Sequence, residues 1–182
     1  MRSAPTPKPS IQRTDHQTQP PGSPRAAAPL AGLDGVPWSD IQDSTGSAAA
    51  IPRLLRKVAR GDAETARAAL GDLRKRICQY GFVVEQATAA TVPFLWELAQ
   101  RPQVNCRAQI IQLLKNIADA RQWETTATAY PKLLNHRENP VVWERAARQA
   151  VRARRDGLER LLAEGDTEIT RATTELARTL GD

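Results

Sequence analysis

Residues 51–73, IPRLLRKVARGDAETARAALGDL, contain the pattern from which the fold is predicted. Apolar residues return every three or four positions on both sides of Gly61, which is the spacing of one face of an α-helix. Pro52 lies in a first turn, where its missing N–H does least harm, and Gly61 followed by Asp62 is typical of a helix end and the next N-cap. The stretch predicts two helices joined by a short turn, which is a helical hairpin.

The same pattern recurs three more times, in residues 92–114, 130–151 and 156–177. The first three copies begin with an apolar residue and a proline, spaced 41 and 38 residues apart, and the fourth has glycine in place of the proline. Each copy has an apolar pair, a polar break and an arginine 14 or 15 residues after the proline or glycine: Arg67, Arg107, Arg145 and Arg171. Self-similarity at this period predicts stacked repeats that share one core.

Each second helix is expected to bury a face with helical spacing. The expected residues are Ala66, Ala69, Leu70, Leu73, Ile77 and Tyr80, then Val104, Ala108, Ile111, Leu114 and Ala118, then Val142, Ala146 and Ala150, and last Ile169, Ala172, Leu176 and Leu180. No segment alternates apolar and polar residues with β-branched enrichment, so no strands are expected.

This unit resembles the HEAT repeat in its helix pairs, the proline of its first helix, the Asp or Asn at its turn and the recurring arginine. Residues 80–98, YGFVVEQATAATVPFLWEL, are also similar to a segment of bacterial HEAT-like (armadillo-type) proteins of undefined role. The resemblance covers about residues 47–180 and implies an all-α fold: a short right-handed α-solenoid of about four HEAT-like hairpins.

Residues 1–37 differ from the rest, because they hold eight of the thirteen prolines and few large apolar residues. Such a segment cannot bury enough surface to offset the entropy of ordering, so we expect a disordered Pro-rich arm ahead of an α-solenoid at 38–182. No apolar run is long enough for a secretory signal or a membrane span. The two cysteines, Cys78 and Cys106, are interpreted as buried thiols of a cytoplasmic protein.

The residues needed for catalysis or for holding a cofactor are missing from the sequence pattern. The only imidazoles are His16 and His136, the cysteines are 28 residues apart, and no Gly-rich nucleotide-binding motif occurs. HEAT-like DNA glycosylases place an Asp and aromatic residues in a cleft, but Trp96, Trp123 and Trp143 are better interpreted here as packing residues. The sequence therefore predicts a protein that is not an enzyme and has no cofactor or metal.

The second helices of such a stack line its concave side. The polar residues expected there form a basic groove: Arg74, Lys75, Gln109, Gln112, Lys115, Asn116, Arg148 and Arg152. Arginine binds carboxylates well, so the leading hypothesis is an adaptor, regulatory or immunity-type scaffold that binds an acidic protein surface.

Three alternatives stay open at this point. In the first, the basic face binds no partner and is a charged helix face exposed to solvent. In the second, the chain is a divergent enzyme subunit whose site forms only with its partner. The same arginines can also contact nucleic-acid phosphates, although aromatic residues make up only 4% of the chain and residues 38–182 carry +4 of the total net charge of +6.

Overall fold

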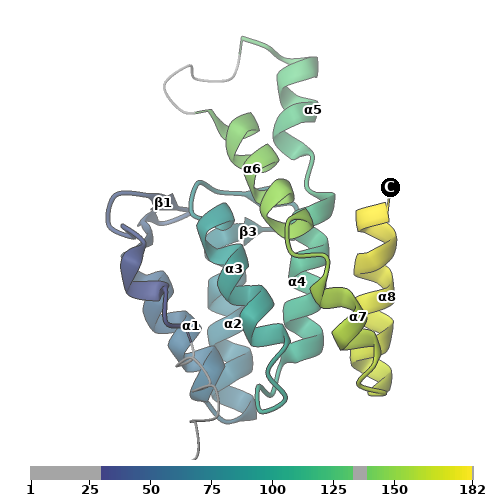
Figure 1. Cartoon of the computed structure of the whole chain (residues 1–182). Coiled ribbons are helices and arrows are strands. Elements are labelled where there is room, and N and C mark those ends of the chain that lie inside the picture. Colours follow the sequence, from purple (N-terminus) through teal and green to yellow (C-terminus); the bar gives the residue numbers. More distant parts are fainter. Residues whose placement is uncertain (1–29, 133–138, 182) are drawn as a thin grey trace, which may run out of the picture.

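The computed structural model describes residues 30–132 and 139–181, and most of these residues are helical (Figure 1). The α-helices are α1 Ile51–Arg60, α2 Ala63–Ile77, α3 Thr88–Ala99, α4 Arg107–Asp119, α5 Gln122–Ala129, α6 Pro140–Arg152, α7 Gly157–Leu162 and α8 Thr167–Gly181. Short 3₁₀ helices η1 and η2 cover Leu33–Gly35 and Ala48–Ala50. Within the described ranges, no helix has both the length and the apolar character to cross a membrane.

Two small strand pairs were not expected from the sequence. Strands β1 (Gln42–Asp43) and β2 (Gly46–Ser47) pair antiparallel, and so do β3 (Cys78–Gln79) and β4 (Val83–Val84). Each strand has two residues, which is too short for a periodic pattern to appear in the sequence. The expectation of a mainly helical chain holds, while the expectation of no strands is wrong.

The hairpin α1–α2 forms as residues 51–73 predict. Pro52 occupies the first turn of α1, and the backbone N–H of Gly61 closes that helix on the Lys57 carbonyl at 2.8 Å. The Asp62 carboxylate accepts the Thr65 N–H at 2.8 Å, and hydrogen bonds from Thr65 lower the pKa of Asp62. The two helices then bury their apolar stripes against each other.

Helix α4 is central to the packing of the remaining helices. Helix α8 lies along α4, and α3 and α6 also pack on it (Figure 1). The hairpin α7–α8 therefore packs mainly on the second hairpin, α3–α4. In a regular succession of repeats it would pack on α6 instead. Helices α5 and α6 project beyond the other helices at one end of the molecule.

The third repeat differs from its prediction in two ways. The predicted copy begins at Tyr130, whereas helix α5 lies just before it and ends at Ala129, and the expected apolar pair Leu133 and Leu134 lies outside the described residues. Helix α6 begins as expected, with the Asn139 side chain accepting the Val142 N–H at 3.2 Å.

The face that α6 buries is also not the predicted one. Val142 is 52% exposed, and Ala146 and Ala150 are only half-buried. The buried face instead consists of Pro140, Glu144, Ala147, Arg148 and Val151. The prediction is wrong because it assigned the buried face to apolar residues, whereas this helix meets its neighbours through a charged pair.

The packed structure begins earlier than the predicted boundary at residue 37. Leu30 and Leu33 are buried, and the Trp38 indole N–H donates to the Leu33 carbonyl at 2.7 Å. The Trp38 ring also contacts Phe94 of α3, with centroids 6.1 Å apart. Leu30 and Leu33 are thus part of the core, with Val36 packed partly against it. The rest of the expected arm, residues 1–29, lies outside the described residues.

Candidate functional site

A groove of about 310 Å³ lies between α2 and α4. Both helices line it with residues at helical spacing: Arg67, Leu70, Gly71 and Arg74 from α2, and Gln109, Gln112, Leu113 and Asn116 from α4. Leu70 and Leu113 are buried and form an apolar floor. The arginines and amides form the polar walls, so the groove is amphipathic. We call it the α2–α4 groove.

The charge of this groove comes from two arginines. Arg67 and Arg74 are exposed, and among the described residues neither guanidinium has an ion pair or hydrogen bond. No carboxylate is among the residues that line the groove. The two arginines are seven positions apart, which is about 10.5 Å along a helix axis. The groove therefore presents two unpaired cations, two helical turns apart, above an apolar floor.

The thiols of Cys78 and Cys106 lie near these arginines and are expected to be unreactive. Burial raises the pKa of Cys78 to about 12, and the positive charge of Arg74 offsets this only in part. Burial also raises the pKa of Cys106, against a backbone hydrogen bond and the charge of Arg67. Both residues are buried and unpaired, as the sequence predicts. A thiol with a raised pKa is a poor nucleophile near neutral pH.

The structure brings only part of the predicted basic surface together. Four of the eight predicted residues line the α2–α4 groove: Arg74, Gln109, Gln112 and Asn116. Lys75 lies outside the lining, 3.4 Å from Asp72. Lys115 also lies outside it and pairs with Asp119 at 2.9 Å. Arg152 is exposed on α6 and does not line the groove.

Arg148 is the clear exception to the prediction. Its guanidinium donates to the Ala120 carbonyl at 2.8 Å and lies 2.9 Å from a Glu124 carboxylate oxygen and 3.5 Å from Glu144. The residue is only 7% exposed. Arg148 is therefore wrong as a partner-binding residue, because its donors are already used inside the protein.

Glu144 completes this cluster from the same helix. It is 0% exposed, and its carboxylate accepts the backbone N–H groups of Trp123 at 2.9 Å and Glu124 at 3.1 Å. These two donors open α5, where a helix has no internal acceptors for them. Hydrogen bonds from Arg148 and then from Arg145 lower the pKa of Glu124 to about 2. Glu124, Glu144, Arg145 and Arg148 tie α4, α5 and α6 together, and we call them the α4–α5–α6 junction.

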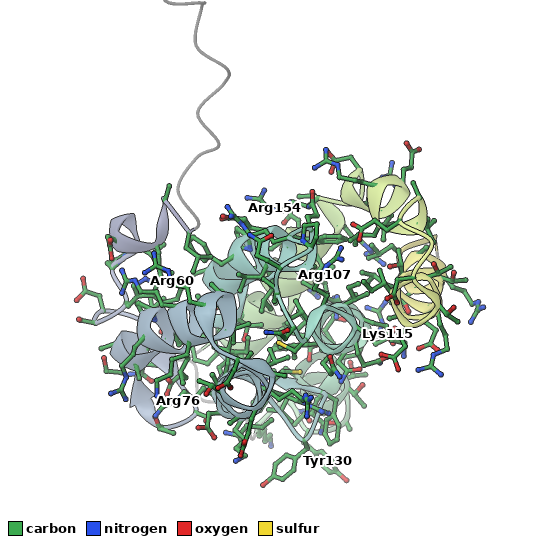
Figure 2. The ribbon with its side chains drawn as sticks, turned by 90° about the horizontal axis from the view of Figure 1, so that it is seen from below. Arg60, Arg76, Arg107, Lys115, Tyr130 and Arg154 are labelled. Carbon is green, nitrogen blue, oxygen red and sulfur yellow. The ribbon has the colours of Figure 1, made fainter. Side chains whose placement is uncertain are left out.

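Two of the four recurring arginines hold parts of the chain together. Arg107, which lies inside the outline of the molecule in Figure 2, donates to the Ala99 carbonyl at 2.7 Å and to Glu164 at 2.6 Å. Arg145 donates to Glu124 at 2.7 Å.

The other two recurring arginines differ from each other. Arg67 lines the α2–α4 groove and, at its outer side, a second depression that also holds Asp166 and Glu168. Arg171 shares a depression between α4 and α8 with Glu168 and Glu175. The basic surface therefore does not continue from α4 to α8, because acidic residues accompany the arginine there.

An exposed aromatic pair near the groove was missed by sequence reasoning. Tyr80 and Phe82 are 83% and 48% exposed, and their ring centroids lie 6.2 Å apart in the turn between β3 and β4. Tyr80 was expected in the core, but α2 ends at Ile77 and the chain turns back. The glycine that follows Tyr80, ahead of the apolar pair Val83 and Val84, was the signal for such a turn.

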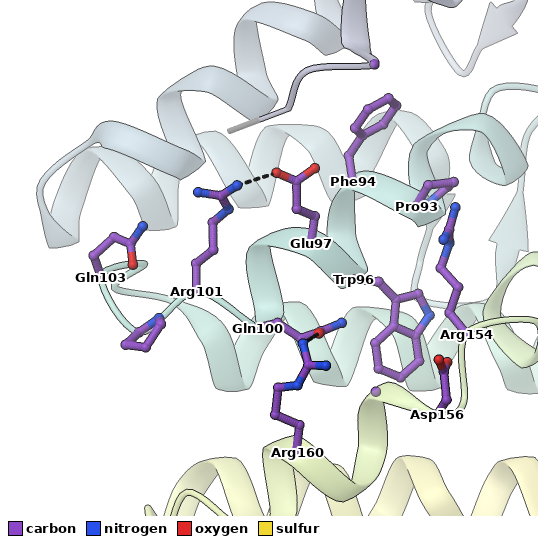
Figure 3. A pocket seen from close by; sticks show the side chains of 13 residues that line it. Pro93, Phe94, Trp96, Glu97, Gln100, Arg101, Gln103, Arg154, Asp156 and Arg160 are labelled. Atoms are coloured by element: carbon purple, nitrogen blue, oxygen red, sulfur yellow. Dashed lines mark hydrogen bonds and ion pairs between the residues drawn. The ribbon is translucent and has the colours of Figure 1, made fainter. Parts of the chain in front are cut away.

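A larger cavity of about 880 Å³ lies between α3 and the start of α7 (Figure 3). Its lining holds acids and arginines together: Arg101 pairs with Glu97 at 2.6 Å, Arg160 donates to the Gln100 side chain at 2.7 Å, and Arg154 and Asp156 also face the cavity. Trp96 forms part of the wall and is 1% exposed, and its indole N–H has no partner in the described structure. Because acids and arginines alternate here, this cavity selects the charge of a ligand less than the α2–α4 groove does.

Comparisons with known proteins do not assign this site. No protein-family model, no curated protein and no solved structure matches the chain. Within residues 30–132 and 139–181, no three His, Cys, Asp or Glu side chains gather as a metal site requires. The function has to be argued from the geometry alone.

Proposed function

We propose that this chain is a non-catalytic protein-binding scaffold that holds an acidic segment of a partner protein in the α2–α4 groove. One observation carries the proposal: Arg67 and Arg74 are exposed and unpaired above the buried Leu70 and Leu113, with no carboxylate lining the groove. A guanidinium fork can bind a carboxylate through two parallel hydrogen bonds. The apolar floor adds a place for a partner's aliphatic side chain.

The proposed architecture is a short HEAT-like solenoid of three hairpins, α1–α2, α3–α4 and α7–α8, with α5–α6 as an inserted brace. Two observations support it. The second helices α2 and α4 run side by side, since Arg67 shares a depression with Gln109, and Arg74 and Asn116 both lie close to Gly81. Helix α8 extends this layer along the other side of α4. A layer of parallel second helices is the surface that such stacks use for binding.

Nucleic acid is the less suitable ligand for this groove. Binding to single strands gains affinity from each phosphate neutralised, with a salt slope of about −0.7 per contact. Two arginines therefore provide only about −1.4, and the amides and leucines beside them add no charge. A protein segment can use both the cations and the apolar floor.

The test is a selection of random displayed peptides on the full chain, followed by affinity measurements with two charge-reversal variants. The test variant is Arg67→Glu/Arg74→Glu. The control is Arg53→Glu/Arg60→Glu on α1, because these residues are also exposed, also seven positions apart and outside the groove. Selected peptides are expected to be rich in Asp and Glu. They should bind the test variant at least tenfold more weakly and the control within about twofold of the parent chain.

Two outcomes would contradict the proposal. One is a selected pool without acidic enrichment, or no selected pool at all. The other is an equal loss of affinity in both variants, which would mean that overall charge and not the groove is responsible. A labelled single-stranded RNA tested in parallel should bind more weakly than the peptides, and the reverse order would favour the nucleic-acid alternative.

A further inference from the structure

The turn between β3 and β4 exposes two aromatic side chains at a conformational cost. Tyr80 has φ of 54°, a left-handed backbone conformation that is uncommon for a bulky residue. Backbone N–H groups of Gly81 and Phe82 close the turn on the carbonyls of Cys78 and Gln79 at 3.2 and 3.0 Å. Backbone strain is often retained at binding sites, and exposed aromatic rings often mark a contact surface. Both features occur together in this turn.

This aromatic turn lies directly at one end of the α2–α4 groove. A Cβ atom placed on Gly81 would lie 2.9 Å from the Arg74 guanidinium and 3.3 Å from the Asn116 amide. The φ of 85° at Gly81 favours glycine, because other residues rarely adopt this backbone conformation. The groove and this turn therefore lie next to each other, and together they make one candidate surface, with Arg74 and Asn116 at the place where they meet.

We infer that the segment held by this surface is an amphipathic helix with two acidic residues seven positions apart and a large apolar residue one turn beyond one of them. The inference rests on the function proposed above and specifies the partner. The acids would meet Arg67 and Arg74, and the apolar residue would pack on Tyr80 and Phe82. Charge complementarity favours this occupant, because the groove lining holds two free cations and no carboxylate.

A helix fits the spacing of the surface on both walls. Arg67 and Arg74 are two turns apart on α2, and Gln109 and Asn116 are two turns apart on α4. In a third helix placed along the groove, residues seven positions apart have the same separation as Arg67 and Arg74. Its intervening turn then brings an apolar side chain over Leu70 and Leu113, in the manner of a helix bound in a groove.

The experiment uses four labelled synthetic helical peptides and fluorescence anisotropy with the full chain. The parent peptide has two glutamates seven positions apart, leucine between them and tryptophan one turn beyond the second. One derivative replaces the tryptophan with serine, one moves the second glutamate by two positions, and one replaces both glutamates with glutamine. The protein variants are Tyr80→Ser/Phe82→Ser, Arg67→Glu/Arg74→Glu and Tyr130→Ser. Tyr130 is the matched control, because it is a 62% exposed aromatic residue outside the groove lining.

The parent peptide should bind at least tenfold more tightly than each derivative, and Tyr80→Ser/Phe82→Ser should weaken its binding at least tenfold. The serine derivative should bind the parent chain and this variant equally, since it lacks the side chain that reaches the turn. Tyr130→Ser should change nothing, and thermal unfolding should show that all variants remain folded.

The outcomes separate the two proposals. Binding that depends on Arg67 and Arg74 but not on Tyr80 and Phe82 would overturn this inference and leave the proposed function standing. Binding that is independent of the glutamate spacing would also overturn the inference. Binding that is insensitive to the arginines, or no binding of any peptide, would overturn the inference and count against the proposed function as well.

Discussion

Arg74 and Arg148 show how two regions with the same predicted role become different in the folded chain. Both arginines were assigned to one basic concave surface, yet Arg74 is exposed in the α2–α4 groove while Arg148 is 7% exposed in the α4–α5–α6 junction. Arg148 has Glu144 one helical turn before it, and Arg74 has Leu70 at the same place. Arg148 pairs with an acid in the chain and therefore has a structural role. Arg74 has no such acid, so its guanidinium stays available to a partner protein.

The largest expected effect is that of Glu144→Ala in the junction. The substitution leaves the backbone N–H groups of Trp123 and Glu124 without acceptors and removes one buried partner of Arg148. Losing one member of a buried charged cluster typically destabilises a protein by about 3–5 kcal/mol. Chemical denaturation followed by circular dichroism measures the loss in the free energy of unfolding.

Arg152→Ala is the control for this prediction, because Arg152 is an exposed residue on the same helix. Its substitution should change the free energy of unfolding by less than about 0.5 kcal/mol. If Glu144→Ala were as mild as Arg152→Ala, the junction would not be a structural element, and its difference from the groove would disappear.

A smaller effect is expected when the two arginines are compared directly. Arg148→Met leaves the Ala120 carbonyl and the Glu144 carboxylate without their guanidinium donor, and hydrogen bonds to charged groups contribute about 1.5–3 kcal/mol. Arg74→Met removes no ion pair or hydrogen bond in the described structure, so its effect should stay within about 0.5 kcal/mol. Urea denaturation of both variants measures this contrast directly. Equal losses would show that Arg74 also has a structural role and is not free for a partner.

Much of the helical structure could be predicted from the sequence, because the signals are local. Asp62 caps the helix predicted for it, and Asn139 and Asp166 do the same at the other turns, each accepting a backbone N–H three residues ahead. The apolar stripe of α8 is buried as predicted at Ile169, Ala172, Leu176 and Leu180. Caps and helical periodicity act within a few residues, so one repeat can be interpreted without knowing where the others lie.

The errors come from features that depend on distant parts of the chain. Helix α8 packs mainly on α4, although α5 and α6 lie between the two in the sequence, and no spacing within either helix signals this arrangement. Arg148 meets Glu124 from another helix, so its burial could not be inferred from its own helical face. In the candidate site, Arg74 of α2 and Gln109, Gln112 and Asn116 of α4 line the groove, whereas Lys75 and Lys115 do not. The aromatic turn was missed, because an apolar residue in register with a helix was assumed to continue that helix.

The smallest expected effect is a pH dependence of the free energy of unfolding. It is expected in the junction, which contains acids, and not in the groove, whose lining contains none. Glu124 is ionised more easily in the folded chain, with its pKa lowered from 4.5 to about 2 by Arg148 and Arg145. A lowered pKa in the folded state means that the carboxylate stabilises the fold above the unfolded value, near 4.5, and that this stabilisation is lost as the pH falls toward 2. Because the side chain is 25% exposed, solvent screening should limit the contribution to about 1 kcal/mol.

The measurement is the difference in free energy of unfolding between the parent chain and Glu124→Gln from pH 6 down to pH 2. This difference should be constant above about pH 5 and shrink below it, as the parent chain loses the advantage of its carboxylate. Glu159→Gln is the control, because Glu159 is exposed on α7 and has no ion pair among the described residues. The same measurement on Arg67→Met/Arg74→Met should give no pH-dependent difference, because the groove lining has no acid to titrate. A pH-dependent difference in the groove variant would show that these arginines already have an acidic partner within the chain, and the groove would then not be free to bind another.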